Sequence, residues 1–501
     1  MRLPPLQDLP NHLATAHIVA HPQLYPGYAF NGLLRSNSLL TLWFLAWGDR
    51  DLFLAARLFV ALVLAVTALA IPLFLLYFGG RRHLLVALLF AWPLVHSFAV
   101  SMGFLNFAFA FALSLVLLTW LDTQARRPRL AVGAGIAALS GLVWFAHPFP
   151  VAVVGGLAAW QTAARPDWRA RGQAACALLL PLAPAALLSL LTAHHHLWRA
   201  DPAGASRWPG FAYLDPGEIL AHLWTDVSGA FTGWGCATIV PAVLLPWLAW
   251  KQRHRELPLL SRSALAALAG AYLALPVTLA NWCYLNCRLV PFLWAGLLLR
   301  LPRELPRPIT GALVGCALAY SAATGVDYLR LDHDRAQLTA GIEAMPRGAS
   351  LLPLMFQQRR TSRFTASLTH VWGYYTVLKD TSAPLVFAVE RSYPIGYRTP
   401  PLPALVPPAL DRFAELQGTP AQVCRRLGRW PVDAGCRAAW QELWTGFWRQ
   451  AEPRFDHLLT WAMPDEARAL IPARYHRVFA ASQLEIYARD QGVAGRCAAS
   501  R

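Results

Sequence analysis

Charged side chains are scarce in this chain of 501 residues. They make up 14% of it, whereas an ordinary soluble domain carries about 25%. Lysine occurs only at Lys251 and Lys379, so arginine supplies nearly all of the positive charge. Hydrophobic residues reach 56%. A water-soluble core cannot bury that much apolar surface, so the composition excludes an ordinary soluble fold for most of the chain.

The signatures of common soluble enzymes are missing as well. No glycine-rich nucleotide loop, HExxH zinc motif or GxSxG nucleophile elbow stands in a suitable context. The eight cysteines show no CxxC pairs of the kind that bind zinc, which excludes a zinc scaffold. Only Cys424 and Cys436 are candidates for a disulfide.

Long apolar runs are what the sequence does contain. A helix needs roughly 20 apolar residues to cross about 30 Å of hydrocarbon, and fewer where it is short or broken. Ten segments qualify: 53–78, 84–101, 104–121, 130–146, 149–164, 174–193, 234–250, 263–280, 284–299 and 309–325. They predict a polytopic α-helical membrane protein with about ten transmembrane helices.

Arginine clusters fall in every second loop between these runs, for example at Arg81 and Arg82. A net charge of +17 can indicate a nucleic-acid partner, but short clusters between apolar runs are typical of cytoplasmic loops. We therefore expect membrane lipid and no nucleic acid as a partner. The alternate loops, including the long loop 194–233, are then outside the cell membrane, and periplasmic if the host is a bacterium.

An even number of crossings places residues 1–52 and 327–501 outside too. The polar N-terminal region has no apolar run to take it across, so we also expect a transmembrane helix upstream of Met1. The predicted organisation is an outer N-terminal region with short helices (1–52), a transmembrane domain (53–326) and a soluble extracytoplasmic domain (327–501). The expected location is a bacterial inner membrane.

The last third of the chain changes in texture, with charges of both signs and proline-rich linkers. Strands are predicted over 350–356, 385–389, 457–462 and 477–487, and helices over 411–416 and 436–449. We expect a small α/β or α+β domain.

Carboxylates that could act as a general base on the outer face of the membrane half are few. They are Asp8, Asp49, Asp51, Asp201, Asp215, Glu218 and Asp226.

Several motifs resemble the GT-C superfamily of membrane glycosyltransferases. The opening DLPNHLATA is similar to its first-loop motif, and YPGYAFNGLL, the Gly-Phe-Leu-Asn turn at Gly103 to Asn106 and the RLVPF segment from Arg288 agree with it. The architecture is related to protein mannosyltransferases and lipid A aminoarabinose transferases. The resemblance implies a polyprenyl-phosphate-linked sugar donor and an acceptor glycan, lipid or protein at the outer face.

The resemblance also implies roles for single residues. Asp8 matches the first-loop acid, which would act as general base or hold a divalent metal; alternatively, it caps the helix that follows. No second acid stands beside it, which leaves a metal cofactor open. His12 would orient Asp8 or the leaving phosphate, or be a surface histidine. Arg288 would hold the donor phosphate, or extend its side chain to the interface.

Other candidates for substrate binding are Asn106, in the Gly-Phe-Leu-Asn turn, and His370, whose segment LTHVWGYY would contact an acceptor sugar or belong to the core. Glu218, His222 and Asp226 fall on a helix predicted over 216–227 in the long outer loop, where they would supply a second carboxylate or lie in solvent.

Two other function classes stay open. A transporter or flippase of lipid-linked glycans fits a polytopic chain, but the spans hold almost no charge and show no repeated halves. A non-catalytic membrane assembly or scaffold protein would need no acid at Asp8.

Overall fold

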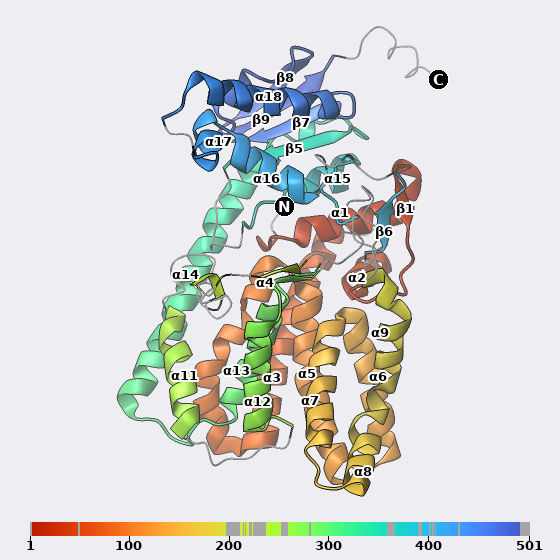
Figure 1. Cartoon of the computed structure of the whole chain (residues 1–501), viewed down its shortest axis with the longest axis vertical. Coiled ribbons are helices and arrows are strands. Elements are labelled where there is room, and N and C mark those ends of the chain that lie inside the picture. The colour runs from red at the N-terminus through yellow and green to blue at the C-terminus, as the bar shows by residue number, and fades with distance from the viewer. Residues whose placement is uncertain are drawn as a thin grey trace.

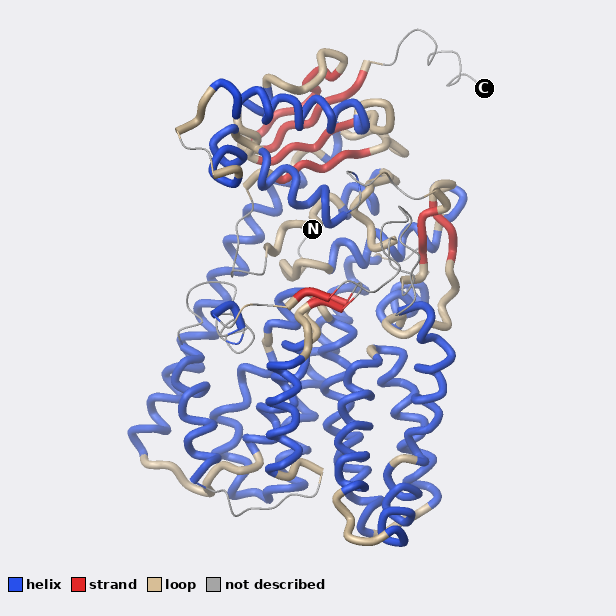
Figure 2. The backbone as a smooth tube through the Cα atoms, in the orientation of Figure 1, coloured by secondary structure: helices blue, strands red, loops and turns tan. Residues whose placement is uncertain are grey.

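In the computed structural model the chain forms a helical bundle at one end and a sheet domain at the other (Figures 1 and 2). The long helix α14 (Arg307–Thr339) runs from the bundle into the sheet domain. The structure describes residues 3–48, 51–196, 211–213, 215, 217–219, 223, 237–251, 259–279, 282–357, 366–388, 393–399, 402, 405, 407–428 and 431–490.

Apolar helices make up the bundle. Their bounds are α3 (Leu52–Val95), α5 (Leu105–Arg126), α6 (Leu130–Ala146), α7 (Pro148–Ala163), α8 (Trp168–Leu178), α9 (Ala183–His196), α11 (Ile239–Lys251), α12 (Arg262–Ala274) and α13 (Val290–Leu298). Among the residues that the structure describes, four helical stretches are long and apolar enough to cross a membrane: Leu52–Met102, Leu105–Arg126, Trp168–Thr192 and Arg307–Ala344.

Helix α3 is two arms that reverse at Gly80. This glycine has φ 75° and ψ 174°, a backbone conformation outside the helical region that glycine adopts without a Cβ clash. Both ends of the stretch lie beside the same helix α1 (Leu9–Ala20): Leu52 and His17 line one cavity, and the Asp8 N–H donates to the Met102 carbonyl. The sequence predicted this pair of segments separately, with the arginine loop between them.

Each of the ten predicted apolar segments overlaps a helix, but ten crossings are not shown. Helix α12 has 13 residues and gives way to the short strand β3 (Thr278–Leu279), where the sequence predicted a run to residue 280. A straight crossing needs about 20 residues. Conversely, α14 has 33 residues and passes through the expected domain boundary at Asp327.

Helix α1 lies between the bundle and the sheet domain, and two glycines without side chains allow it to pack closely against both. A Cβ on Gly103 would lie 2.8 Å from the Asp8 nitrogen, and a Cβ on Gly373 would lie 2.4 Å from the Pro10 carbonyl oxygen. One glycine follows α4 (Phe98–Met102) on the bundle side and the other begins α15 (Gly373–Lys379) on the domain side. Neither position tolerates a side chain without moving α1.

The N-terminal region also pairs with the far end of the chain. Strand β1 (Tyr28–Phe30) is antiparallel to β6 (Ile395–Tyr397). Helix α2 (Leu39–Trp47) follows and packs on α1 and α3. A second small sheet joins β2 (Phe211–Ala212), β3 and β4 (Trp282–Cys283).

The C-terminal domain is built on a mixed sheet in the order β5-β7-β9-β8. Strand β5 (Leu351–Met355) is parallel to β7 (His457–Trp461), while β9 (Leu484–Arg489) is antiparallel to β7 and to β8 (Tyr475–Ala481). Leu351, Leu459 and Ile486 face the core shared with α14, and Leu352 and Leu458 face the other core. This second face is covered by α16 (Pro407–Gln417) and α18 (Ala434–Ala451).

Cys424 and Cys436 form a disulfide, as predicted, between α17 (Pro420–Arg426) and α18. The predicted strand over 385–389 is wrong for its described part, residues 385–388. The Leu385 carbonyl and the Phe387 N–H bond to the Asn11 side chain, so they do not enter a ladder. The predicted strand over 477–487 is a hairpin of β8 and β9 with a turn at Ser482.

Candidate active site

Asp8 precedes the first turn of α1, and its carboxyl is nearly buried, with 11% of the side chain exposed. Its side chain makes no capping hydrogen bond to α1, which excludes the alternative that it serves as a helix cap. The proline at the start of α1 removes a backbone N–H that a cap would satisfy. The carboxylate is therefore available to other groups.

The nearest partner of Asp8 comes from the C-terminal domain. His370 Nε2 lies 3.5 Å from Asp8 Oδ1, and both side chains are buried. Asn11, one turn further along α1, holds this contact in place. Its amide donates to the Leu385 carbonyl and accepts from the Phe387 N–H, and Nδ2 lies 3.5 Å from His370 Nδ1. The site therefore forms only when the C-terminal domain is docked on α1.

His12 lies on the same face of α1 as Asp8, four residues on. Its ring contacts the rings of Phe387 and Tyr393, with centroids 5.8 and 6.4 Å apart. Burial lowers the pKa of His12 to about 4, although the charge of Asp8 opposes the shift. His12 is therefore neutral at pH 7 and buried, which excludes a surface histidine.

Arg288 approaches from the bundle, just before α13. Its guanidinium is buried: Nη1 lies 2.9 Å from His147 Nε2 and Nη2 donates to the Cys283 carbonyl. It stacks over Phe104 and Phe107, 4.7 and 5.1 Å from the ring centroids. This excludes the alternative of a side chain extended to the interface. Its Nε has no hydrogen-bond partner among the described residues, and Asp8 lies within electrostatic range.

His147 ties Arg288 to the bundle. It separates α6 from α7, and its Nδ1 accepts the Phe149 N–H at the start of α7. This bond fixes the ring so that Nε2 faces the guanidinium. The sequence signal for this role is faint, because a histidine before a proline reads simply as the end of a helix.

The structure thus brings together four of the predicted site residues: Asp8, His12, Arg288 and His370. Asn106 has a structural role. Its amide nitrogen donates to the carbonyl and the side-chain oxygen of Asn37, and its oxygen accepts the Leu40 N–H. It therefore anchors the start of α2, and no donor remains for a substrate.

The predicted residues of the long outer loop are placed only in part. The backbone N–H of Glu218 donates to Asp215 Oδ1 in the same loop. Residues 217–219 are helical, as predicted. His222 and Asp226 lie outside the described residues. Asn11 and Tyr393 were missed, because an asparagine inside a helical motif and a tyrosine in a proline-rich linker carry no chemical pattern of their own.

Metal ligands are few in the described part of the site. Throughout the described residues, no three His, Cys, Asp or Glu side chains gather as metal ligands. A divalent ion held by the Asp8 carboxylate would therefore need water or a substrate phosphate for its remaining ligands. The chemistry that these residues can support is proton transfer at Asp8 and stabilisation of an anion at Arg288.

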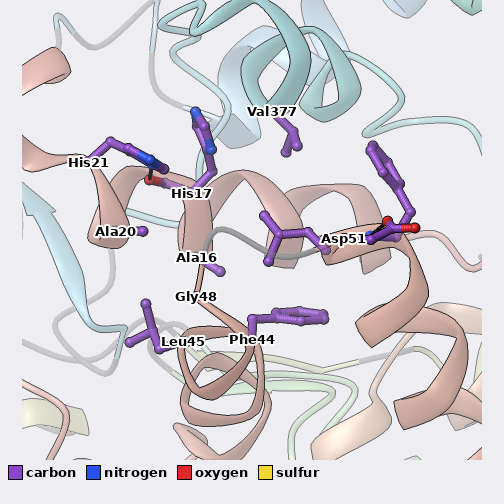
Figure 3. Close-up of a pocket in the computed structure, with 11 residues that line it drawn as sticks. Ala16, His17, Ala20, His21, Phe44, Leu45, Gly48, Asp51 and Val377 are labelled. Atoms are coloured by element: carbon purple, nitrogen blue, oxygen red, sulfur yellow. Dashed lines mark hydrogen bonds between the residues drawn. The ribbon is translucent and has the colours of Figure 1, made fainter.

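The opposite face of α1 borders a cavity of about 470 Å³ (Figure 3). It is lined by His17 of α1, His21 just after α1, Phe44 of α2, Asp51 just before α3 and Val377 of α15. Asp51 is committed to the N–H groups of Phe53 and Leu54. This cavity is mainly apolar and lies on the other side of α1 from Asp8.

Comparison of the chain with family models, with curated proteins and with solved structures gave no match. The assignment of function therefore depends on these residues and their geometry.

Proposed function

We propose that this protein is a GT-C type membrane glycosyltransferase, which moves a sugar from a polyprenyl-phosphate donor to an acceptor at the outer face of the membrane. One observation carries the proposal. A buried carboxylate without a capping role, Asp8, meets His370 of the C-terminal domain, with the buried guanidinium of Arg288 nearby. A base and an anion-binding group thus converge where the two halves of the molecule meet.

Placement in a membrane follows from the bundle. Its outward-facing positions include Leu69, Leu73 and Leu85 of α3 and Leu318 of α14, which are 60–71% exposed. Large apolar side chains exposed to this extent suit lipid and not water. With the two arms of α3 counted separately and the shorter helices included, we propose ten crossings, with the arginine loops cytoplasmic. The disulfide of the C-terminal domain suits an oxidising, extracytoplasmic compartment.

The reaction that this site supports is a substitution at the anomeric carbon. The acceptor oxygen forms a bond to that carbon and its proton passes to Asp8. The bond between the carbon and the phosphate oxygen breaks, and its electron pair leaves with the polyprenyl phosphate. Arg288 stabilises the charge on the leaving phosphate, because a desolvated guanidinium binds phosphate more strongly than one in water.

Neutral His12 serves as a hydrogen-bonding group beside Asp8. A cationic histidine here would stabilise the carboxylate and weaken it as a base. Burial of His12 keeps its pKa at about 4, so that it does not compete for the proton at neutral pH.

The donor's phosphate enters from the bundle side. A small cavity beside Arg288 is lined by Phe98, Phe104, Phe107 and Pro291. Its volume is only about 10 Å³, about that of one water, so its apolar walls must move apart to admit the first isoprene unit of the carrier and bring the phosphate to the guanidinium. We place the acceptor on the opposite side of Asp8, toward His370.

The test is transfer in proteoliposomes. Purified protein is supplied with radiolabelled polyprenyl-phosphate-linked hexoses or pentoses and with envelope lipids and glycans of the host as acceptors, and label leaving the donor is measured. We expect transfer by the natural protein and a loss of about 10²-fold or more in Asp8→Asn. The matched control is Asp51→Asn, an outer carboxylate that caps α3.

Equal transfer by Asp8→Asn and the natural protein, with unchanged unfolding temperature, would refute Asp8 as the base. Absence of transfer from every donor would favour the non-catalytic assembly protein.

A further inference from the structure

A second cavity lies between α14 and the edge of the C-terminal sheet, with a volume of about 540 Å³. We propose that it binds a neutral carbohydrate, one to three sugar units long. It is lined by His333, Asp334, Gln337, Met355, Gln357, Leu368, Trp461, Ser482 and Gln483. The inference depends on this lining and is independent of the proposed transfer reaction.

Side-chain amides dominate the polar lining. Gln337 comes from α14, Gln357 follows β5, and Gln483 lies in the turn between β8 and β9. An amide offers both a donor and an acceptor, which matches the paired hydroxyls of a sugar better than a charged group does. Three amides from three separate elements surround one space, so they can hold hydroxyls on different edges of a ring.

Part of this lining is already oriented. Gln337 Nε2 lies 2.9 Å from His333 Nε2, one turn earlier on α14. The Ser482 hydroxyl donates to Gln337 Oε1 at 3.3 Å. These bonds fix the amide of Gln337 across the gap between α14 and the hairpin. The groups are therefore positioned before a ligand arrives, which lowers the entropy cost of binding.

The floor of the cavity is apolar. Trp461 at the end of β7, Met355 at the end of β5 and Leu368 are all buried in the core shared with α14. A pyranose has polar edges and an apolar face of C–H groups, and an aromatic residue supplies an apolar surface for that face. A polar rim over such a floor is the usual composition of a small-molecule site, whose volume is about 300–1,000 Å³.

Charge argues against other ligands. None of the nine lining residues that the structure describes is a lysine or arginine, so this described lining offers hydrogen bonds and an apolar surface more than it offers a cation for a phosphate or carboxylate. Asp334 supplies a carboxylate, which also accepts hydrogen bonds from sugar hydroxyls.

The backbone is strained at two places beside the cavity. Ser482 has φ 54°, and Ala462, the residue after Trp461, has φ 52°. Neither is glycine, and strain of this kind gathers at ligand sites. Ser482 lies in the hairpin turn that borders the cavity, and the Ala462 N–H donates to the Gln483 carbonyl of the same turn.

The cavity shares a wall with the candidate active site. Leu368 lines it, and His370, two residues on, contacts Asp8. A bound glycan would therefore lie next to the segment that carries His370.

Saturation-transfer NMR on the full-length protein in lipid nanodiscs tests the proposal. Nanodiscs avoid sugar-headed detergents, which would compete. The probes are maltose, cellobiose, α-1,6-mannobiose and N,N′-diacetylchitobiose, with spermidine as a cationic probe. We expect saturation of at least one sugar, and at least tenfold weaker binding in Gln337→Leu and in Gln483→Leu. Gln441→Leu is the matched control, because Gln441 is exposed on α18 over the other face of the sheet.

Three outcomes would overturn the proposal: no saturation of any sugar, binding by both variants that equals that of the natural protein, or saturation of spermidine alone. Gln483 is exposed, so its variant should keep the natural unfolding temperature even if Gln337→Leu does not. Asp8→Asn should bind sugar normally. Loss of transfer with binding intact, or the reverse, therefore separates this inference from the proposed function.

Discussion

Helix α1 takes part in two aspartate–histidine contacts, one on each of its opposite faces. The two contacts differ in whether an arginine also pairs with the aspartate. On one face, His17 Nε2 lies 2.9 Å from Asp380 Oδ1, and Arg347 pairs with the other oxygen of Asp380 at 2.5 Å. On the other face, Asp8 and His370 are 3.5 Å apart, and Asn11, not a cation, holds the histidine. In the first contact the carboxylate is paired with the Arg347 guanidinium and hydrogen-bonded to His17, whereas the described contacts of Asp8 include no such direct ion pair with an arginine.

Protonation behaviour follows this difference. Burial opposes ionisation of Asp380, but the hydrogen bonds from His17 and Arg347 outweigh it and lower the pKa of Asp380. A carboxylate held in this way is a poor base. The same pair of residue types therefore serves structure on one face of α1 and suits chemistry on the other.

The largest expected effect contrasts the two aspartates directly. Asp8→Asn should reduce sugar transfer by 10²- to 10⁴-fold, the usual contribution of a general base, without changing the unfolding temperature by more than a few degrees. Asp380→Asn should leave the rate per folded molecule unchanged, because the described contacts of its carboxylate are with His17 and Arg347, on the opposite side of α1 from Asp8. Rates in proteoliposomes, divided by the folded fraction, check both. A greater loss in Asp380→Asn would reverse the roles assigned to the two faces.

Features of the fold and site that depend on neighbouring residues could be predicted from the sequence, whereas contacts between residues far apart in the chain could not. Local apolar runs predicted the helices of the bundle, and Arg81 and Arg82 predicted a loop between the two arms of α3. Asp8, His12, Arg288 and His370 could be named because each stands in a motif with chemical character. The packing of residues 385–388 against Asn11 could not be predicted from the sequence, because this asparagine bonds to backbone groups more than 370 residues away. The number of crossings stays a prediction, since hydropathy does not show where a helix such as α12 stops.

The next largest effect tests the asparagine that holds the Asp8 face together. Asn11→Ala leaves the Leu385 carbonyl and the Phe387 N–H buried without their partner, which should cost about 3 kcal/mol of stability. It should also reduce transfer, because His370 loses its support. Thermal unfolding in nanodiscs measures the change. Gln7→Ala is the control, since Gln7 accepts one N–H from the same domain and should cost about 1 kcal/mol. Equal losses of stability in Asn11→Ala and Gln7→Ala would show that Asn11 contributes no more to the docking of the C-terminal domain than Gln7 does.

A smaller effect concerns pH and the buried histidine of the Asp8 face. The folded-state pKa of His12 is about 4, against 6.5 when unfolded, so below pH 6.5 the unfolded chain binds more protons and stability falls as pH falls. The loss should be about 2 kcal/mol at pH 5 and should level off below pH 4. Unfolding temperatures at pH 7 and pH 5 measure it. In His12→Asn the difference between the two pH values should shrink; an unchanged difference would place the acid sensitivity elsewhere.

The smallest effect lies on the other face, at Arg347. Its side chain is 72% exposed, so solvent screens its pairing with Asp380, and Arg347→Ala should cost only about 0.5 kcal/mol at pH 7. The pKa of Asp380 is lowered in the fold, so this pairing stabilises the protein above the unfolded pKa of 3.8 and is lost as pH falls through the folded value. The gap between Arg347→Ala and the natural protein should therefore close in acid. Arg437→Ala, at an exposed arginine of α18, controls for loss of positive charge. A stability difference between Arg347→Ala and the natural protein that stays constant from pH 7 to pH 3 would mean that Arg347 stabilises the protein by packing. The charge of Asp380 would then be neutralised less by Arg347 than the geometry indicates.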